Sequence, residues 1–351
     1  MNILPVGFKN NYNAYNQIQQ ANYQTKPLYR NELKQDTVCF TSGKKQLEHW
    51  TKEISHDVVK KIHDESVPEL KDFLRLLRDE LKPLVESKQN PNGIICPGEV
   101  GIKGRVKGPD SLREKILALN SEEDEEGLLK EILTKSDIEH RVGDIIGLRI
   151  VFRDSSQSNF ASVFKKFENL VKKGKFRVLE IENYRSNPKN AYVGQATLDH
   201  FEETCRSVGL HPSITSKSRG SGYEAVHLNV ILPDGKIAEI QMMGRDIEQV
   251  KEIEDFFYKL DCKKKFAKRY RHIQELMEEK IKGLDDLQKG VLSRYITDSY
   301  KHAREIPALP HTKREYSLKN FIDFPYLLPE ELSFPHLYKM KADADFAATL
   351  V

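Results

Sequence analysis

The sequence has few cysteines, and they lie far apart. Only four occur in 351 residues, and no two form a Cys-x-x-Cys pair or another spacing typical of a zinc finger. Secreted domains that depend on disulfides carry cysteine at a much higher density. We therefore expect neither a structural zinc site nor a disulfide framework, and we expect a reducing, cytoplasmic location. The cysteines are Cys39, Cys96, Cys205 and Cys262.

Long hydrophobic runs are also lacking. No stretch approaches the roughly 18 apolar residues that a membrane-spanning helix needs. Residues 1–13 are rich in asparagine and do not show a basic segment followed by an apolar one. The sequence therefore predicts neither a transmembrane helix nor an export signal.

An excess of charge of one sign is the third absence. Lysine and arginine number 56, and aspartate and glutamate number 53, so the formal net charge is +3. A nucleic-acid partner must therefore be argued from a local basic patch. Hydrophobic residues make up 38% of the chain, which is enough for a core, and the length suits about two domains.

Hydrophobic periodicity divides the chain into three parts. Residues 1–44 are rich in Asn, Gln and Tyr without an apolar period, which predicts a mobile tail. Residues 45–262 show helical and strand periods and form the predicted core domain. Residues 263–351 are predicted to be an extension with helices and a proline-rich, irregular end.

The core pattern predicts an α+β fold, in which helices flank a mixed sheet. Residues 45–85 show a helical spacing that includes Val58, and we expect an N-terminal helical pair that is broken near Pro68. Further helices are expected at residues 111–119, 127–134, 160–171, 246–260 and 274–298.

The strand signals are strongest in two places. Residues 144–152 form a β-branched run typical of a buried strand. Residues 225–232 and 237–242 alternate in polarity around Pro233-Asp234-Gly235, which predicts a hairpin. A weaker signal predicts another strand at residues 176–181.

A basic segment precedes the buried strand. Arg105 and Lys107 share a face if their segment is extended. Ser111 can cap the next helix, whose first turn would add Arg113 and Lys115. Cations around a helix N-terminus can hold a polyphosphate, because the exposed N–H groups add to their charge. The alternative is a solvated basic loop.

Two acidic residues belong to predicted strands. Asp144 begins the buried strand, and Glu239 lies on the second hairpin strand with Gln241 on the same face. Carboxylates from two strands can share a divalent metal ion, or divide the roles of ligand and general base. The alternative is a capping or salt-bridging role for each.

A glycine-containing segment, Lys217-Ser-Arg-Gly-Ser-Gly-Tyr-Glu-Ala-Val-His227, precedes the first hairpin strand. Its glycines allow the backbone to approach a ligand. Tyr223 offers a flat surface on which a base can stack, and His227 is expected on the same face. The alternative is a flexible loop followed by a core tyrosine.

Together, and in this order, these segments resemble the RelA/SpoT family of nucleotide pyrophosphokinases, in its small form that has a synthetase domain alone. The resemblance covers residues 45–259. Relative to the family, residues 190–216 look inserted. The motifs are Arg-Val-Lys-Gly-Pro-Asp-Ser-Leu-Arg-Glu-Lys, Asp-Ile-Ile-Gly-Leu-Arg-Ile-Val-Phe, Gly-Tyr-Glu-Ala-Val-His and Asp-Gly-Lys-Ile-Ala-Glu-Ile-Gln.

The resemblance implies transfer of the β,γ-pyrophosphate of ATP to the ribose 3′-hydroxyl of GDP or GTP, which makes the (p)ppGpp alarmone of the stringent response. It implies that Asp144 and Glu239 bind Mg²⁺, with Glu239 as a ligand or as the group that activates the hydroxyl. Tyr223 would stack on the acceptor base. ATP would be bound by Arg105, Lys107, Ser111, Lys115 and Arg149, and the acceptor by Lys217, Arg219, Tyr223, His227 and Gln241.

Two other functions stay open at this point. Some small relatives in this family pyrophosphorylate the 3′ end of tRNA, and a basic cluster with interleaved aromatic residues suits RNA phosphates. A catalytically silent nucleotide-binding module is the other alternative. Self-association into a homo-oligomer is also possible. The cluster consists of Lys263, Lys264, Lys265, Lys268, Arg269 and Arg271, with Phe266 and Tyr270 between them.

Two His-Asp pairs, His56-Asp57 and His63-Asp64, invite comparison with the hydrolase site of the long family members. They fall on a predicted helix at seven-residue spacing, and the additional ligands that such a site needs are not apparent. We interpret them as a solvated face of this helix.

Overall fold

The computed structural model describes residues 56–91, 93–95, 102–120, 138–139, 142–153, 156–184, 193–217, 222–261, 266–305 and 323–347. These residues form two compact units. The sheet unit comprises the described residues up to 217 together with 224–244, and the helical unit comprises 222–223 and the described residues from 245 onward. The predicted tail at 1–44 and the predicted helix at 127–134 lie outside the described residues.

The sheet unit is built on a mixed six-stranded sheet with the order β1-β2-β6-β5-β3-β4. The pairs β2–β6 and β3–β4 are parallel, and the other neighbours are antiparallel. The predicted α+β class is therefore confirmed, as are the buried strand and the hairpin. The strands are β1 (Ile102–Val106), β2 (Ile146–Phe152), β3 (Arg177–Tyr184), β4 (Ser213–Lys217), β5 (Ala225–Ile231) and β6 (Ile237–Gly244).

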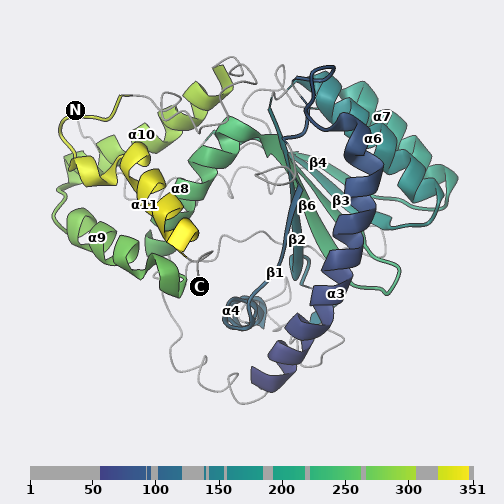
Figure 1. The fold of residues 1–351 in the computed structure, drawn as a ribbon, viewed down its shortest axis with the longest axis horizontal. Coiled ribbons are helices and arrows are strands. Elements are labelled where there is room, and N and C mark those ends of the chain that lie inside the picture. The colour runs from purple at the N-terminus through teal and green to yellow at the C-terminus, as the bar shows by residue number, and fades with distance from the viewer. Residues whose placement is uncertain are drawn as a thin grey trace, which may run out of the picture. The chain divides into compact units, whose positions relative to one another are not determined.

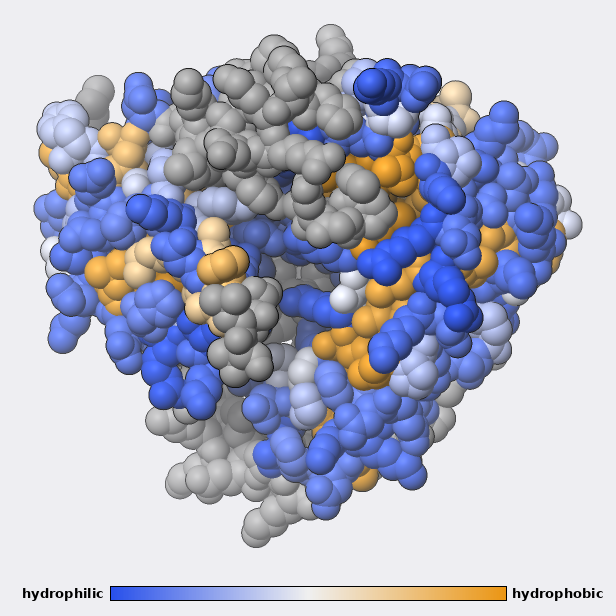
Figure 2. All heavy atoms as spheres, in the orientation of Figure 1, coloured by the Kyte–Doolittle hydropathy of each residue, from blue (hydrophilic) through white to orange (hydrophobic). Residues whose placement is uncertain are grey.

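Three helices lie on one side of this sheet (Figure 1). They are α3 (His56–Leu81), α6 (Gln157–Lys172) and α7 (Gln195–Ser207). Aromatic rings join them to the core, since Phe176 lies 6.0 Å from Phe73 of α3 and 5.8 Å from Phe167 of α6, measured between ring centroids. The outer surfaces of α6 and α7 are mostly hydrophilic (Figure 2).

A single helix occupies the stretch in which the sequence predicts a break. Helix α3 continues through Pro68, so that prediction is wrong. Pro68 is exposed, while Ile62, Ser66 and Leu70 continue one buried stripe past it. Burial of this stripe therefore maintains the helix where proline removes a backbone hydrogen bond. Val58, expected in the stripe, is 36% exposed, and Val59 is buried instead.

The next helix also begins earlier than predicted. Helix α4 (Pro109–Asn120) begins before Ser111, so Ser111 does not cap it. Pro109 takes the first helical position, for which its fixed φ and missing N–H are well suited. The short 3₁₀ helix η1 (Lys82–Leu84) follows α3.

The segment that looks inserted in the sequence is ordered secondary structure. Its described part, from residue 193, contains α7 and most of β4, which continues to Lys217. With β3 these two elements form a parallel β-α-β unit at the edge of the sheet. No pattern in the sequence predicted α7 or β4.

The helical unit consists of α8 (Arg245–Asp261), α9 (Arg271–Lys282), α10 (Asp286–Glu305) and α11 (Phe334–Ala347), with the short 3₁₀ helices η3 (Lys268–Tyr270) and η5 (Glu330–Leu332). Helix α8 packs against α9, α10 and α11. The ring of Phe334 contacts those of Phe257 and Tyr295, at centroid distances of 6.2 and 5.0 Å.

The helix predicted at residues 274–298 is in fact two helices, α9 and α10. Gly283 weakens the helix at this point. Asp285 and Gln288 then form a reciprocal cap: the backbone N–H of Asp285 donates to Oε1 of Gln288 at 3.0 Å, and that of Gln288 donates to Oδ1 of Asp285 at 2.8 Å. Among the described helices, none combines the length and the apolar composition that a membrane span requires.

The continuous form of α3 can be tested at its proline. Pro68→Ala restores an N–H to an exposed position inside the helix, so we expect the free energy of unfolding to increase by about 1–3 kcal/mol. Urea unfolding followed by circular dichroism measures this. Pro83→Ala is the matched control, because Pro83 lies in the first turn of η1, where proline is tolerated. Unchanged or reduced stability in Pro68→Ala would indicate a helix that is broken at this position.

Candidate active site

The sheet has a polar side that faces away from α3, α6 and α7. Gly104 of β1 faces α3, since a Cβ at this position would lie 2.6 Å from the Cδ1 atom of Leu70 and 2.9 Å from that of Leu74. Successive residues of a strand point to opposite sides. Lys103 and Arg105 therefore point to the other side of the sheet.

The strand register extends this polar side across the sheet. Arg105 pairs with Gly147, which pairs with Glu239, and Glu239 pairs with Asn229. A second row runs from Lys103 through Arg149, Gln241 and His227 to Glu182. We call this side the polar face. Its residues are Lys103, Arg105, Gly147, Arg149, Glu239, Gln241, His227, Asn229, Glu180, Glu182, Tyr184, Ser213, Thr215 and Lys217.

Two of the lysines that are predicted to bind phosphate form ion pairs with Asp144. Lys107 Nζ lies 2.5 Å from Oδ2 of Asp144, and Lys115 Nζ lies 2.8 Å from Oδ1. Lys107 follows β1, Lys115 comes from α4, and Asp144 comes from the turn before β2. All three side chains are mostly buried, at 14–19% exposure. Residues of two sequence motifs therefore form one ionic cluster.

Backbone hydrogen bonds hold the end of β1 at this cluster. The N–H of Lys107 donates to the carbonyl of Ile145, at 2.8 Å. The Nδ1 atom of His63 in α3 donates to the carbonyl of Lys107, at 3.1 Å. The prediction of a wholly solvated face is therefore wrong for His63, which holds the strand that carries the cations.

Glu239, the second predicted acid, is held by two side chains of the polar face. His227 Nδ1 lies 3.1 Å from Oε1, and Gln241 Nε2 donates to Oε2 at 2.7 Å. Burial acts to raise the pKa of Glu239, but the charge and the hydrogen bond of His227 outweigh it and lower the pKa to about 2, against an opposing effect of Asp144. Glu239 is therefore a carboxylate at neutral pH, and it feels the charge of Asp144.

The other residues predicted to bind ATP occupy different positions. The side chain of Arg105 lies next to Gly147, since a Cβ atom at position 147 would lie 3.8 Å from Cγ of Arg105. Arg149 lies between Lys103 and Gln241 in the register. Ser111 is exposed in the first turn of α4. Their binding of ATP stays a prediction.

The residues predicted to bind the acceptor fall in both units. His227, Gln241 and Lys217 belong to the polar face, where Lys217 Nζ binds Glu182. Arg219 lies outside the described residues. Their binding of an acceptor stays a prediction.

Tyr223 belongs to the helical unit and is 1% exposed. Its ring meets that of Tyr300 edge-on at 6.0 Å, and Lys251 Nζ lies 5.9 Å from its centroid. Gly222 precedes it at φ +83°, and Arg304 donates to the Gly222 carbonyl. A base that stacks on Tyr223 must take the place of a neighbour, and the stacking role stays a prediction.

Sequence reasoning missed three residues of this site, namely His63 as a brace for β1, Glu182 and Tyr184. Glu180, Glu182 and Tyr184 recur at every second position of β3, which is a signal for one polar strand side. What the sequence could not provide is the register that aligns Glu182 with His227.

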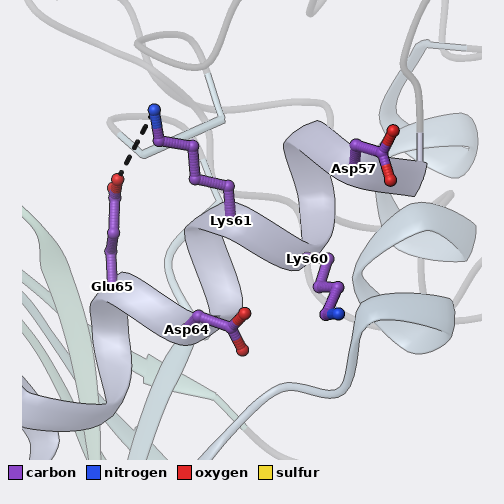
Figure 3. A pocket seen from close by; sticks show the side chains of 5 residues that line it. All are labelled: Asp57, Lys60, Lys61, Asp64 and Glu65. Atoms are coloured by element: carbon purple, nitrogen blue, oxygen red, sulfur yellow. Dashed lines mark ion pairs between the residues drawn. The ribbon is translucent and has the colours of Figure 1, made fainter.

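A hollow of about 390 Å³ lies elsewhere, beside the first turns of α3. Its lining side chains all come from that helix, and Lys61 pairs with Glu65 across one turn at 3.9 Å (Figure 3). No predicted site residue lines it, so we interpret it as a charged helix surface. The lining residues are Asp57, Lys60, Lys61, Asp64 and Glu65.

The donor set limits the kind of metal that would fit. Within the described residues, no group of three or more His, Cys, Asp or Glu side chains could hold a metal ion. Mg²⁺ commonly uses only one or two carboxylates, together with water and substrate phosphates. Asp144 and Glu239 could serve as these carboxylates. A metal site made of protein ligands alone is not found among the described residues.

The basic cluster predicted to bind tRNA lies partly outside the described residues, which omit Lys263, Lys264 and Lys265. Lys268, Arg269 and Arg271 are exposed. Arg269 Nε lies 3.0 Å from Oδ1 of Asp345 in α11, and its guanidinium lies 4.6 Å from the ring centroid of Tyr270. Part of the cluster is therefore neutralised within the helical unit.

Comparison with known proteins gives similar structures only. No family model matches the chain, and no curated protein matches it. A GTP pyrophosphokinase family protein from Streptococcus pneumoniae is 20% identical, with a TM-score of 0.32, over 75% of this chain and 99% of that one. Small alarmone synthetase 1 from Bacillus subtilis, bound to its product pppGpp, is 18% identical, with a TM-score of 0.36, over 74% and 94%.

Small alarmone synthetase 2 from Bacillus subtilis is also similar. It is 17% identical, with a TM-score of 0.32, over 63% of this chain and 96% of that one. Because the identities and TM-scores are low, these similarities carry no conclusion about the function of this chain.

The low pKa of Glu239 predicts a pH dependence of stability. A carboxyl group whose pKa is lower in the folded state, here about 2 against an ordinary 4.5, stabilises the fold above pH 4.5 and loses this effect as the pH falls toward 2. His227→Gln removes the positive charge that lowers the pKa of Glu239 in the folded state. The free energy of unfolding should therefore depend less steeply on pH between about 3 and 5.

Urea titrations across this pH range measure the slope. His200→Gln is the matched control, because His200 lies on the exposed surface of α7, 3.5 Å from Glu168. The contribution assigned to His227 is wrong if both variants keep the wild-type slope.

Proposed function

We propose that this chain is an ATP-dependent nucleotide pyrophosphokinase. It transfers the β,γ-pyrophosphate of ATP to the ribose 3′-hydroxyl of GDP or GTP. The observation that carries the proposal is the convergence on Asp144 of Lys107 and Lys115, at 2.5 and 2.8 Å, in the turn before β2, the strand whose Gly147 pairs with Glu239. Cations and carboxylates in one place are the groups that phosphoryl transfer requires.

The cations of β1, β2 and α4 neutralise the triphosphate of ATP. Lys103, Arg105 and Arg149 lie on the polar face, and Lys107 and Lys115 lie at its edge. The exposed N–H groups at the start of α4 add to this potential. This end of the face therefore suits a polyphosphate more than it suits a base or a sugar.

The reaction forms one bond and breaks one bond. The acceptor 3′-oxygen attacks the β-phosphorus of ATP, the bond from that phosphorus to the α,β-bridging oxygen breaks, and AMP leaves with the electron pair. The hydroxyl proton passes to solvent or to a nearby carboxylate. Because the transition state of such transfers is loose, positioning and charge neutralisation matter more than the strength of the base.

Glu239 suits an orienting role in this reaction. With a pKa of about 2 it is a weak base, but it stays charged and is held on both oxygens by His227 and Gln241. It can therefore accept a hydrogen bond from the attacking hydroxyl or ligate a cation without first losing a proton. Asp144 and Glu239 would hold Mg²⁺, which when bound neutralises charge on the transferred phosphates.

Transfer to the 3′ end of tRNA remains the alternative acceptor reaction, and a silent nucleotide-binding module remains the alternative without chemistry. The pairing of Arg269 with Asp345 reduces the positive potential available to RNA, so we favour a free guanine nucleotide. Self-association stays a prediction that no contact described here addresses.

A labelling experiment tests the proposal and separates the acceptors. The protein is incubated with γ-labelled ATP and Mg²⁺ and with GDP, GTP or deacylated tRNA, and the products are resolved by chromatography. We expect label on GDP or GTP. In Glu239→Gln the rate should fall by about 100-fold or more, because a charge that acts on the transition state is lost.

Glu202→Gln is the matched control, since Glu202 pairs with Arg206 on the surface of α7, and it should retain full activity. Label on tRNA alone would select the other acceptor. ATP binding without any labelled product would leave the silent module, and an active Glu239→Gln would contradict the assigned site.

A further inference from the structure

Lys107 lies at the junction between strand β1 and helix α4, and its main chain and side chain are both bound. Its N–H donates to the carbonyl of Ile145 at 2.8 Å, and its Nζ lies 2.5 Å from Oδ2 of Asp144. Its carbonyl accepts a hydrogen bond from Nδ1 of His63 at 3.1 Å. The first two partners precede β2, whereas His63 belongs to α3. The imidazole therefore links this junction to a helix that is distant in sequence, and we call this hydrogen bond the brace.

The direction of the brace follows from the chemistry of its two groups. A carbonyl oxygen can only accept a hydrogen bond, so Nδ1 of His63 carries the proton. His63 is half-buried, and its helix α3 packs against both β1 and α4 (Figure 1). The donor is therefore supplied by a helix that contacts both of the elements that are joined at Lys107.

Gly108 makes this junction a flexible joint. It lies between Lys107 and Pro109, the first residue of α4. Glycine has access to more backbone conformations than any other residue, and a Cβ at position 108 would have no described atom within 4 Å. The peptide that joins Lys107 to Gly108 contains the carbonyl to which His63 donates. The brace therefore fixes the orientation of a peptide that its own residue types leave free to rotate.

The joint separates the two lysines that bind Asp144. Lys107 precedes it, and Lys115 lies beyond it in α4, with its Nζ 2.8 Å from Oδ1 of Asp144. A rotation at Gly108 would change the distance between the two ammonium groups. Groups that bind one ligand together must keep the spacing of that ligand, and an error of about 1 Å is costly. The orientation of the peptide after Lys107 therefore determines whether both lysines can bind one polyphosphate.

We propose that His63 is a positioning residue for ATP: by holding the carbonyl of Lys107, it keeps Lys107 and Lys115 at the spacing that the triphosphate requires. The inference rests on the proposed function, in which these lysines neutralise the triphosphate. His63 acts through Lys107 and does not touch the nucleotide. Because the brace holds the main chain, it persists when phosphate oxygens draw the ammonium groups away from Asp144.

Asparagine and glutamine at position 63 test the geometry of the brace. The amide nitrogen of asparagine is as many bonds from Cβ as Nδ1 of histidine is, whereas that of glutamine is one bond further. Isothermal titration calorimetry uses inorganic tripolyphosphate, which has neither base nor ribose and needs no catalysis. We expect His63→Asn to bind within about twofold of the wild type and His63→Gln to bind about tenfold more weakly, as for one lost hydrogen bond. Equal affinities of the two variants would overturn the proposal.

His56→Gln is the matched control, because His56 is exposed and lies two turns earlier on the same helix. It should bind tripolyphosphate as the wild type does. A loss of affinity equal to that of His63→Gln would show a general effect of α3 and would contradict the proposal.

Gly108→Ala tests the joint itself. The φ angle of Gly108 is not positive, and the added Cβ has space, so alanine is tolerated and restricts the backbone. Combined with His63→Gln, it should restore part of the lost affinity for tripolyphosphate, and no gain would contradict the proposal. Gly108→Ala alone covers the case in which the His63 variants do not fold. It should bind at least as tightly as the wild type, and weaker binding would overturn the role of the joint.

Kinetics then connect the brace to the reaction. In His63→Gln the KM for ATP should rise about tenfold while the KM for GDP or GTP stays unchanged, and His63→Asn should retain both values. Equal damage to both substrates would indicate a merely structural role and contradict the proposal. If the tripolyphosphate pattern is observed but the wild type transfers no pyrophosphate, the proposed function fails and the role of His63 stands. Transfer without that pattern gives the reverse result.

Discussion

Parallel pairing of β2 with β6 is the constraint on which the site depends. It places Gly147 beside Glu239 and Arg149 beside Gln241, residues that lie about ninety positions apart in the chain. The antiparallel partner β1 then adds Arg105 and Lys103 on one flank, and β5 adds Asn229 and His227 on the other. A shift of one residue in any of these pairs would turn the polar side chains toward the helices.

Apolar packing on the opposite side of the sheet fixes this register. Ile146, Leu148 and Ile150 of β2 are all at most 2% exposed, and Gly104 allows α3 to approach β1 closely. The same strands therefore supply the core and the site, and hydrophobic burial on one side specifies which charges meet on the other. The buried carboxylates are tolerated because each has a cation or a hydrogen-bond donor.

Alternation of residue types made part of this arrangement predictable. The apolar run of β2 and the Pro233-Asp234-Gly235 turn were sufficient for the buried strand and the hairpin, and these carry Arg149, His227, Glu239 and Gln241. Helix limits were less predictable, because tertiary burial outweighed Pro68, while Gly283 and the cap at Asp285 ended a helix that periodicity continued. The roles of His63 and Glu182 depend on contacts between segments distant in sequence, which no local pattern encodes.

The edge position of β4 has a consequence for how such a chain can vary. Since β4 pairs with β3 alone, a segment containing α7 and β4 can be gained or lost without changing the register of the central strands. Glu182 does not share this freedom, because without β4 its buried charge would lose Lys217. The segment that contains α7 and β4 is therefore coupled to position 182 through this ion pair.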